Sequence, residues 1–166
     1  MTSHSISNHG LAILAVSLPE GVYFNLAETT VENNASDQSG QLLAEKLLYG
    51  FKDIRRDLSI LFSDGLLSDA SSLIHGIQSR LGKSFPVIGG SASDALSFKQ
   101  TFIYANQQLS SHSAAAILLG GRFRFGIGIK HGLKPIGKPR EITTSAGNVI
   151  FEIDNQPAIH LYQDYL

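Results

Sequence analysis

The feature that most constrains the fold is a pair of short apolar runs, residues 58–62 and 85–88, on either side of an amphipathic segment. Both runs have the length and composition of buried strands, and the segment between them has the apolar period of a helix. Two strands of one sheet joined by a crossover helix are parallel. The sequence therefore predicts a βαβ unit, whose helix carries its apolar stripe on Leu66, Ala70, Leu73, Ile74, Ile77 and Leu81, with Gly82 at its end.

Upstream of this unit, two further strands and a helix are predicted. Residues 11–18 and 22–26 read as strands separated by a turn at 19–21, a pattern that favours a hairpin. Residues 32–40 are rich in Asn, Ser, Asp and Gly and read as a loop. A helix is predicted from about Gln41, and its apolar stripe consists of Ala44, Leu47, Leu48 and Phe51.

Downstream of the βαβ unit, the pattern favours strands. Residues 99–104 and 113–119 read as β, and Gly120 and Gly121 are typical of a two-residue hairpin turn into an alternating strand over 122–129. A Gly- and Pro-rich loop over 130–139 follows.

The last segment is predicted to hold two strands, 140–145 and 149–153, and a helix. That helix would be capped by Asp154 or Asn155, with Pro157 in its first turn. Together the elements predict an α/β fold leaning toward α+β: a mixed, largely antiparallel sheet with about three helices packed on it. Residues 11–166 would form one domain, after a disordered or cloning-derived leader at 1–10.

Composition excludes several classes of function. The chain has 166 residues and no cysteine, so a disulfide framework, a thiolate metal site and a cysteine nucleophile are ruled out. A net charge of −1 gives no overall attraction to nucleic acid or to an anionic membrane. We find no secretory signal and no apolar run long enough for membrane insertion, and we therefore expect a cytoplasmic protein.

Asp64 is the first candidate ligand-binding residue, since it follows a buried strand and precedes a helix. Ligands of open α/β sheets bind beyond the carboxyl ends of the strands. The alternative is that Asp64 or Ser68 caps the following helix.

A second candidate site lies just after the next strand, where the sequence is Gly-Gly-Ser-Ala-Ser-Asp. Glycine lets a backbone approach a ligand closely, and the polar side chains could hydrogen-bond it; the alternative is a tight turn. A P-loop is excluded, and a serine hydrolase is disfavoured because Ser93 stands where the nucleophile elbow needs glycine. We expect binding without catalysis, by Gly89, Gly90, Ser91, Ser93 and Asp94.

The third candidate is the basic loop over 130–140, which could clamp a carboxylate or phosphate or could simply be solvated. Its candidate residues are Lys130, His131, Lys134 and Gly137. It has too few aromatic residues to indicate nucleic-acid binding. The six histidines lack metal-site spacing, so no cofactor is expected, although one histidine alone could ligate haem.

Several of these motifs, taken in order, resemble the FIST sensory domain, named for F-box and intracellular signal transduction proteins. The resemblance covers residue 11 to the end, and it departs from the family at Asn155, where glycine is more usual. Its motifs are residues 60–65, 87–94, 131–137, Ile142 and Thr143, Gly147 and Asn148, and 152–158 with Tyr162 and Leu166.

The resemblance implies a sensory function and carries over no catalytic residue. Such domains are thought to bind small metabolites, with amino acids the usual suggestion, and they accompany histidine kinases, diguanylate cyclases and chemotaxis receptors. Some relatives bind haem and respond to nitric oxide. The implied partners are a C-terminal FIST portion and a signalling output domain or protein. A haem-binding nitric-oxide sensor and a ligand-free interaction scaffold are the alternatives.

Overall fold

The computed structural model describes residues 13–32 and 34–165. These residues form two compact units, one extending to Arg124 and the other beginning at Phe125. The predicted leader at 1–10 lies outside the described residues. Because the two units are not placed relative to one another, each is described by itself.

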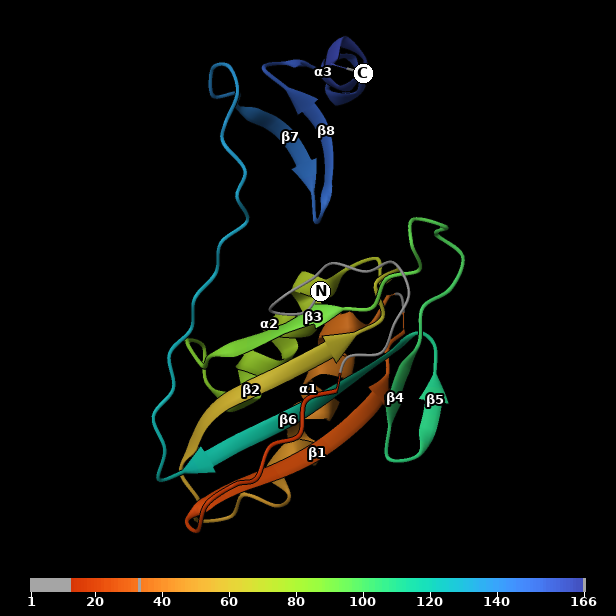
Figure 1. Cartoon of the computed structure of the whole chain (residues 1–166). Coiled ribbons are helices and arrows are strands. Elements are labelled where there is room, and N and C mark those ends of the chain that lie inside the picture. The colour runs from red at the N-terminus through yellow and green to blue at the C-terminus, as the bar shows by residue number, and fades with distance from the viewer. Residues whose placement is uncertain (1–12, 33, 166) are drawn as a thin grey trace. The chain divides into compact units, whose positions relative to one another are not determined.

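The first unit is built on a four-stranded mixed sheet in the order β1-β6-β2-β3 (Figure 1). Its strands are β1 (Val22–Thr30), β2 (Arg56–Ser63), β3 (Val87–Ser91) and β6 (Ser113–Gly121). Strand β6 is antiparallel to both β1 and β2, whereas β2 and β3 are parallel. The predicted βαβ unit and the mixed, mostly antiparallel α/β fold class are thus confirmed.

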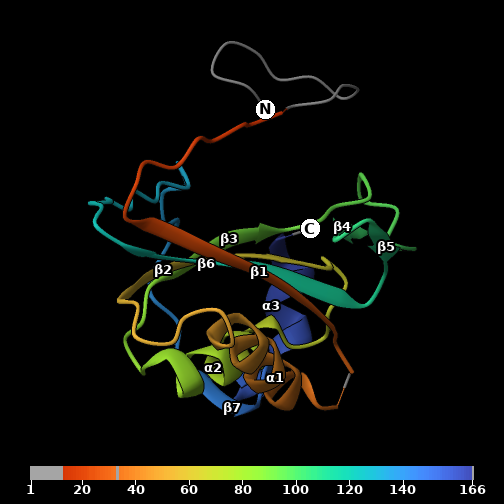
Figure 2. The same ribbon diagram turned by 90° about the horizontal axis from the view of Figure 1, so that it is seen from below.

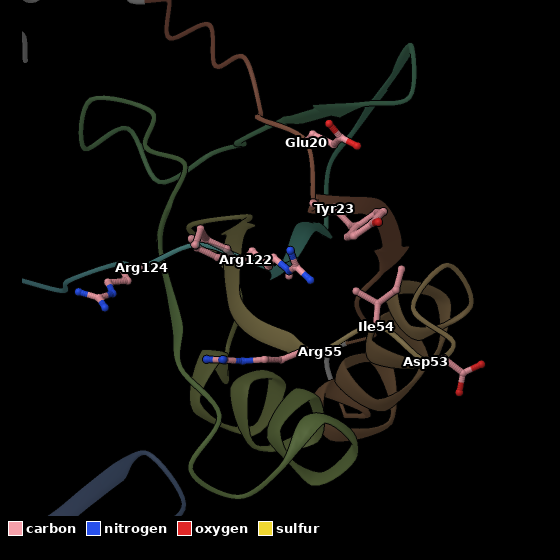
Figure 3. Close-up of a pocket in the computed structure, with 10 residues that line it drawn as sticks. Glu20, Tyr23, Asp53, Ile54, Arg55, Arg122 and Arg124 are labelled. Atoms are coloured by element: carbon pink, nitrogen blue, oxygen red, sulfur yellow. The ribbon is translucent and has the colours of Figure 1, made fainter.

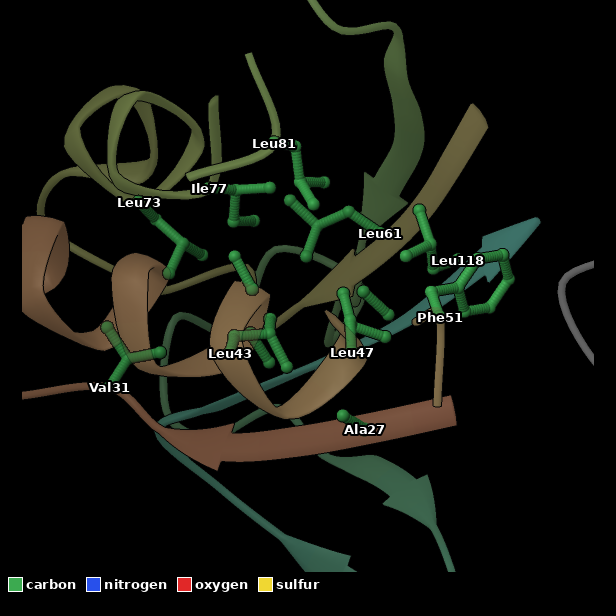
Figure 4. Close-up of a cluster of buried hydrophobic side chains, with 13 residues drawn as sticks. Ala27, Val31, Leu43, Leu47, Phe51, Leu61, Leu73, Ile77, Leu81 and Leu118 are labelled. Carbon is green, nitrogen blue, oxygen red and sulfur yellow. The ribbon is translucent and has the colours of Figure 1, made fainter. Parts of the chain in front are cut away.

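Helices α1 (Ser36–Leu48) and α2 (Ala70–Leu81) cover one face of this sheet (Figure 2). The predicted apolar stripes are confirmed in part: the core contains Ala44, Leu47, Phe51, Leu73, Ile77 and Leu81 (Figure 4). Leu66 lies before α2, and Ala70 and Ile74 are exposed on it. Burial of the core side chains is the main source of stability of the unit. The core comprises Ala27, Val31, Leu43, Ala44, Leu47, Phe51, Leu61, Leu73, Ile77, Leu81, Ala114, Ala116 and Leu118.

Helix α1 begins at Ser36, five residues before the predicted start, so the predicted loop over 32–40 is wrong in its second half. The first turns of the helix are polar in sequence, but Ser36, Ser39 and Gly40 are buried in the structure. At Gly40 an added Cβ would lie 2.2 Å from the carbonyl oxygen of Leu73. Small residues are needed here because the two helix backbones nearly touch.

The strand predicted over 11–18 is not formed in its described part, residues 13–18, and the predicted hairpin is absent there. Ile13, Leu14 and Val16 are 82%, 88% and 68% exposed. Strand β1 pairs with β6 on one side only, and residues 13–18 leave its other side unpaired. Without a strand partner, these apolar residues gain no burial.

The predicted strand over 122–129 and its hairpin turn at Gly120 and Gly121 are also wrong. Both glycines belong to β6, and residues 122–130 are irregular. Strand β6 lies between β1 and β2, so both of its edges are already paired and it has none left for a hairpin partner. The glycines at 89 and 90 likewise lie within β3 and do not end it.

The strand predicted over 99–104 is reduced to β4 (Ile103–Ala105), which pairs with β5 (Gln108–Ser110). The backbone N–H groups of Phe98, Lys99 and Gln100 donate to the carboxylate of Asp94. Those N–H groups are therefore not available to a strand ladder.

The second unit holds β7 (Ile142–Ala146), β8 (Val149–Ile153), β9 (Gln156–Pro157) and α3 (Ala158–Tyr165). The first two strands agree closely with prediction. Asp154 and Asn155, however, form the turn between β8 and β9, with φ of 52° and 61°, and do not cap α3. Asparagine tolerates this left-handed conformation, which explains why it can replace glycine at 155.

Candidate functional site

The carboxyl ends of the parallel strands β2 and β3 lie side by side, as the sequence predicted. The Oγ atoms of Ser63 and Ser91 are 3.0 Å apart, and the N–H of Ala92 donates to the carbonyl of Ser63 at 2.8 Å. At Gly65, an added Cβ would lie 1.8 Å from the carbonyl oxygen of Ala92. This strand-end cluster brings Asp64 together with the segment that contains Gly89, Gly90 and Ser91.

Within this cluster the side chain of Asp64 is 2% exposed and fully engaged in hydrogen bonds. Its Oδ1 accepts from the N–H of Leu66 at 2.8 Å and from the hydroxyl of Thr101, and its Oδ2 accepts from the N–H of His112 at 2.6 Å. Burial would raise the pKa of Asp64, but the hydrogen bonds from Thr101, Leu66 and His112 hold it below its usual value. The ionised carboxylate thus ties three chain segments together.

Asp94 has a similar local role. Its carboxylate accepts three backbone N–H bonds from residues 98–100, at 3.1, 2.7 and 3.2 Å, and these bonds, led by that from Lys99, lower its pKa. Ser93 beside it is exposed. Neither Asp64 nor Ser68 is the cap of α2, because Asp69 occupies that position and accepts from the N–H of Ser72 at 2.9 Å.

The four candidates of the basic loop belong to the second unit. Lys130, His131, Lys134 and Gly137 lie in an exposed, irregular segment. His131 Nδ1 accepts from the N–H of Leu133 at 2.9 Å, which fixes a local turn. Their role in ligand binding stays a prediction, as does that of Gly89, Gly90, Ser91 and Ser93.

Sequence reasoning missed a hollow of about 1190 Å³ in the first unit (Figure 3). Three arginines line it, so we call it the arginine hollow. Arg55 comes from the segment before β2, and Arg122 and Arg124 come from the segment that follows β6. Its lining residues are Glu20, Gly21, Tyr23, Asp53, Ile54, Arg55, Gly121, Arg122, Phe123 and Arg124.

The buried carboxylate of Asp57, whose side chain is 4% exposed, contacts two of the segments that line this hollow. Its Oδ1 lies 2.6 Å from Nη2 of Arg55, and its Oδ2 accepts from the N–H of Gly121 at 3.2 Å. At Gly120 an added Cβ would lie 1.9 Å from the carbonyl oxygen of Arg55. One buried carboxylate and one close backbone contact therefore hold the arginine-bearing segments together.

The hollow carries charges of both signs beside apolar surface. Within the described residues, Arg122 and Arg124 form no ion pair, so their guanidinium groups are available to an anion. The carboxylates of Glu20 and Asp53 lie toward the margin, apart from the arginine head groups (Figure 3). Tyr23, 49% exposed, supplies an aromatic face.

These residues come from three stretches, near 20–23, 53–55 and 121–124, and no local motif unites them. The one available signal was the alternation of Arg122 and Arg124 within the predicted strand over 122–129, and alternation is equally typical of the polar face of a strand. In the described part of the chain, no three His, Asp or Glu side chains gather as metal ligands. None of its helices is long and apolar enough to cross a membrane.

Comparison with known proteins now identifies the family. The model of the FIST N domain matches residues 1–156, nearly the whole chain. The chain belongs to the FIST family. FIST domains are sensory domains of signal transduction proteins, as the sequence motifs had implied.

One curated relative is an uncharacterized protein of Methanocaldococcus jannaschii, MJ1623, which is 31% identical over 83 residues. The match covers 50% of this chain but only 16% of that protein, so the chain spans a small part of its relative. No solved structure matches the chain.

Proposed function

We propose that this FIST domain is a cytoplasmic sensory module that binds a free amino acid in the arginine hollow. The observation that carries the proposal is the presence of unpaired guanidinium groups, carboxylates and an aromatic ring around one space. A zwitterion needs a cation for its carboxylate and an anion for its ammonium. The hollow offers both.

The division of roles follows from the chemistry of each group. Arg122 and Arg124 would bind the ligand carboxylate, because guanidinium forms paired hydrogen bonds to carboxylates. Glu20 or Asp53 would accept the ammonium protons. Tyr23 and Ile54 would contact the ligand side chain, through apolar area and, for a cationic ligand, the ring face.

The proposed role is binding, with no chemical step. A bound ligand shifts a signalling equilibrium only when it binds the two states unequally. The arginine hollow joins segments at the start of β1, the start of β2 and the end of β6. Occupation of the hollow would therefore bias the packing of these segments, and a C-terminal FIST portion or a signalling output domain would read that change.

The test is a thermal-shift screen of the purified chain against the twenty amino acids. A ligand at about 100 times its Kd stabilises the folded state by roughly 2.7 kcal/mol, which raises the melting temperature visibly. Arg122→Gln should abolish the shift. Arg56→Gln, which removes the same charge from an exposed residue outside the hollow, should keep it.

Analogues then separate the two charges of the ligand. The amide of the active amino acid lacks the carboxylate, and its deamino acid lacks the ammonium, so both should lose most of the shift. The proposal fails if no amino acid stabilises the chain, or if Arg122→Gln responds like Arg56→Gln. Loss of the shift in Ser91→Ala alone would move the site to the strand-end cluster.

A further inference from the structure

Strand β3 lies at one edge of the four-stranded sheet and leaves a row of backbone groups unpaired by the sheet (Figure 1). The N–H of Ser59 donates to the carbonyl of Pro86 at 3.0 Å, and the N–H of Ala92 donates to that of Ser63 at 2.8 Å. In a parallel ladder the intervening residues turn away from the neighbour. Val87, Gly89 and Ser91 thus direct their N–H and C=O groups outward.

The sequence of β3, Val-Ile-Gly-Gly-Ser, lacks the side chains that protect many edge strands. Natural sheets guard their edges with charged side chains or proline within the strand. Strand β3 contains neither. Its edge is therefore suited to hydrogen-bond another strand.

Two mainly apolar hollows border β3, one on each face of the sheet. The hollow of about 170 Å³ lies on the α2 side and is lined by Leu61, Leu73 and Ile74. The other, about 570 Å³, is lined by Phe62, Gly90, Phe102 and Tyr104 among others. An added strand turns successive side chains to opposite faces, so both sets of side chains would meet apolar surface. The free edge of β3 therefore favours an added strand with apolar side chains on both faces.

Residues 13–18 have this property. The segment reads Ile-Leu-Ala-Val-Ser-Leu, with apolar residues in both alternating sets. It is irregular, and Ile13, Leu14 and Val16 are largely exposed. Continuous apolar runs of this length are typical of strands covered on both faces. We propose that residues 13–18 of a second copy of this chain add to the free edge of β3, giving a strand-exchanged dimer.

The distances favour a second copy over the same chain. From β1 to a position beyond β3 there are four strand spacings, roughly 19 Å at about 4.8 Å each. From Leu18 to Val22, where β1 starts, there are four residues, which span at most about 14 Å. The segment therefore cannot reach its own β3 while β1 stays paired. Two copies can exchange it reciprocally.

The first test measures molar mass by light scattering during gel filtration, over a series of loading concentrations. The wild-type chain should dimerise as concentration rises. The double variant Leu14→Asp with Val16→Asp should stay monomeric, because residues 14 and 16 share one face of the added strand and would place two charges against one apolar hollow. Tyr49→Asp changes an equally exposed apolar residue, 84% exposed, at the end of α1 and should dimerise normally.

A wild-type chain that stays monomeric throughout, or a double variant that dimerises like wild type, would overturn the proposal. Circular dichroism confirms that each variant is folded.

Cysteine cross-linking then locates the contact, which is straightforward because the chain has no cysteine of its own. Ser91→Cys protein would be mixed in turn with Ala15→Cys, Val16→Cys or Ser17→Cys protein, so that adjacent registers are sampled. At least one mixture should give a disulfide-linked heterodimer in preference to homodimers. Only homodimers, in all three mixtures, would place the contact elsewhere.

Discussion

At the residue scale, Asp64 carries the clearest stability prediction. Its carboxylate accepts from Leu66, Thr101 and His112, so one buried side chain joins segments up to 48 residues apart. Asp64→Asn replaces one acceptor oxygen with an NH₂ group that would face a donor. Hydrogen bonds to charged groups contribute about 1.5–3 kcal/mol each, so we expect a loss of about 2–4 kcal/mol, measured by urea denaturation at pH 7.

The pH dependence of this loss has a definite sign. The folded-state pKa of Asp64 lies below its ordinary value of 3.8, so its contribution is fully present above that value and disappears as pH falls through the folded pKa. The difference in unfolding free energy between wild type and Asp64→Asn should therefore be constant at neutral pH and should shrink below about pH 4. A difference that grows on acidification would contradict this account of Asp64.

At the element scale, the crossing of α1 and α2 gives a prediction whose sign opposes helix propensity. Gly76→Ala in an open helix would stabilise by about 1 kcal/mol. Here the added Cβ would lie 2.0 Å from the carbonyl oxygen of Asp37, and a backbone atom cannot move aside like a flexible side chain. Overpacking typically costs about 1–3 kcal/mol, and a clash with backbone belongs at the upper end of that range. After subtraction of the helix-propensity gain, we expect a net loss of about 1–2 kcal/mol in denaturation.

Gly90→Ala is the matched control, because an added Cβ at Gly90 has nothing within 4 Å. Its stability should change by less than about 0.5 kcal/mol. If Gly76→Ala proved as stable as the wild type, the two helices would have to be farther apart than the structure places them.

A helix or strand was predictable when the pattern of apolar residues within its own segment was enough to identify it. The stripe of α2 and the apolar runs of β2 and β3 fix a βαβ unit without reference to the rest of the chain. The alternation over 122–129 failed because a strand also needs a free edge, and β6 has none. The start of α1 was missed because Ser36, Ser39 and Gly40 are residue types of loops, and only the tertiary structure, with Gly40 against α2, shows that they are buried.

The candidate sites divide in the same way. The strand-end cluster was predictable, since parallel strands bring Asp64 and Ser91 to one edge of the sheet. The hydrogen bonds that occupy the Asp64 carboxylate were not predictable, because two of their donors, Thr101 and His112, lie far along the chain. The arginine hollow depends on the pairing of β1 with β6 and on the close approach of Gly120 to Arg55. Both are tertiary contacts that no local sequence pattern indicates.

At the scale of the whole molecule, the hydrophobic core formed by the described residues lies within the first unit, between Ala27 and Leu118. The segment over 122–141 that follows is irregular and largely exposed, and its basic residues are potential trypsin sites. Exposed irregular backbone is cleaved before packed elements are. Brief trypsin treatment should therefore cut this segment first and release a fragment ending near Arg122 or Arg124.

That fragment should stay folded, because it retains the four-stranded sheet, both helices and every member of the core. Its cooperative thermal unfolding and its slowest-exchanging amides, in β2, β6 and the two helices, should match those of the intact chain. An unfolded fragment would mean that the first unit depends on residues after 124. A folded fragment that retains Arg124 would allow the arginine hollow and the β3 edge to be assayed in the first unit alone, since it contains every residue that lines them.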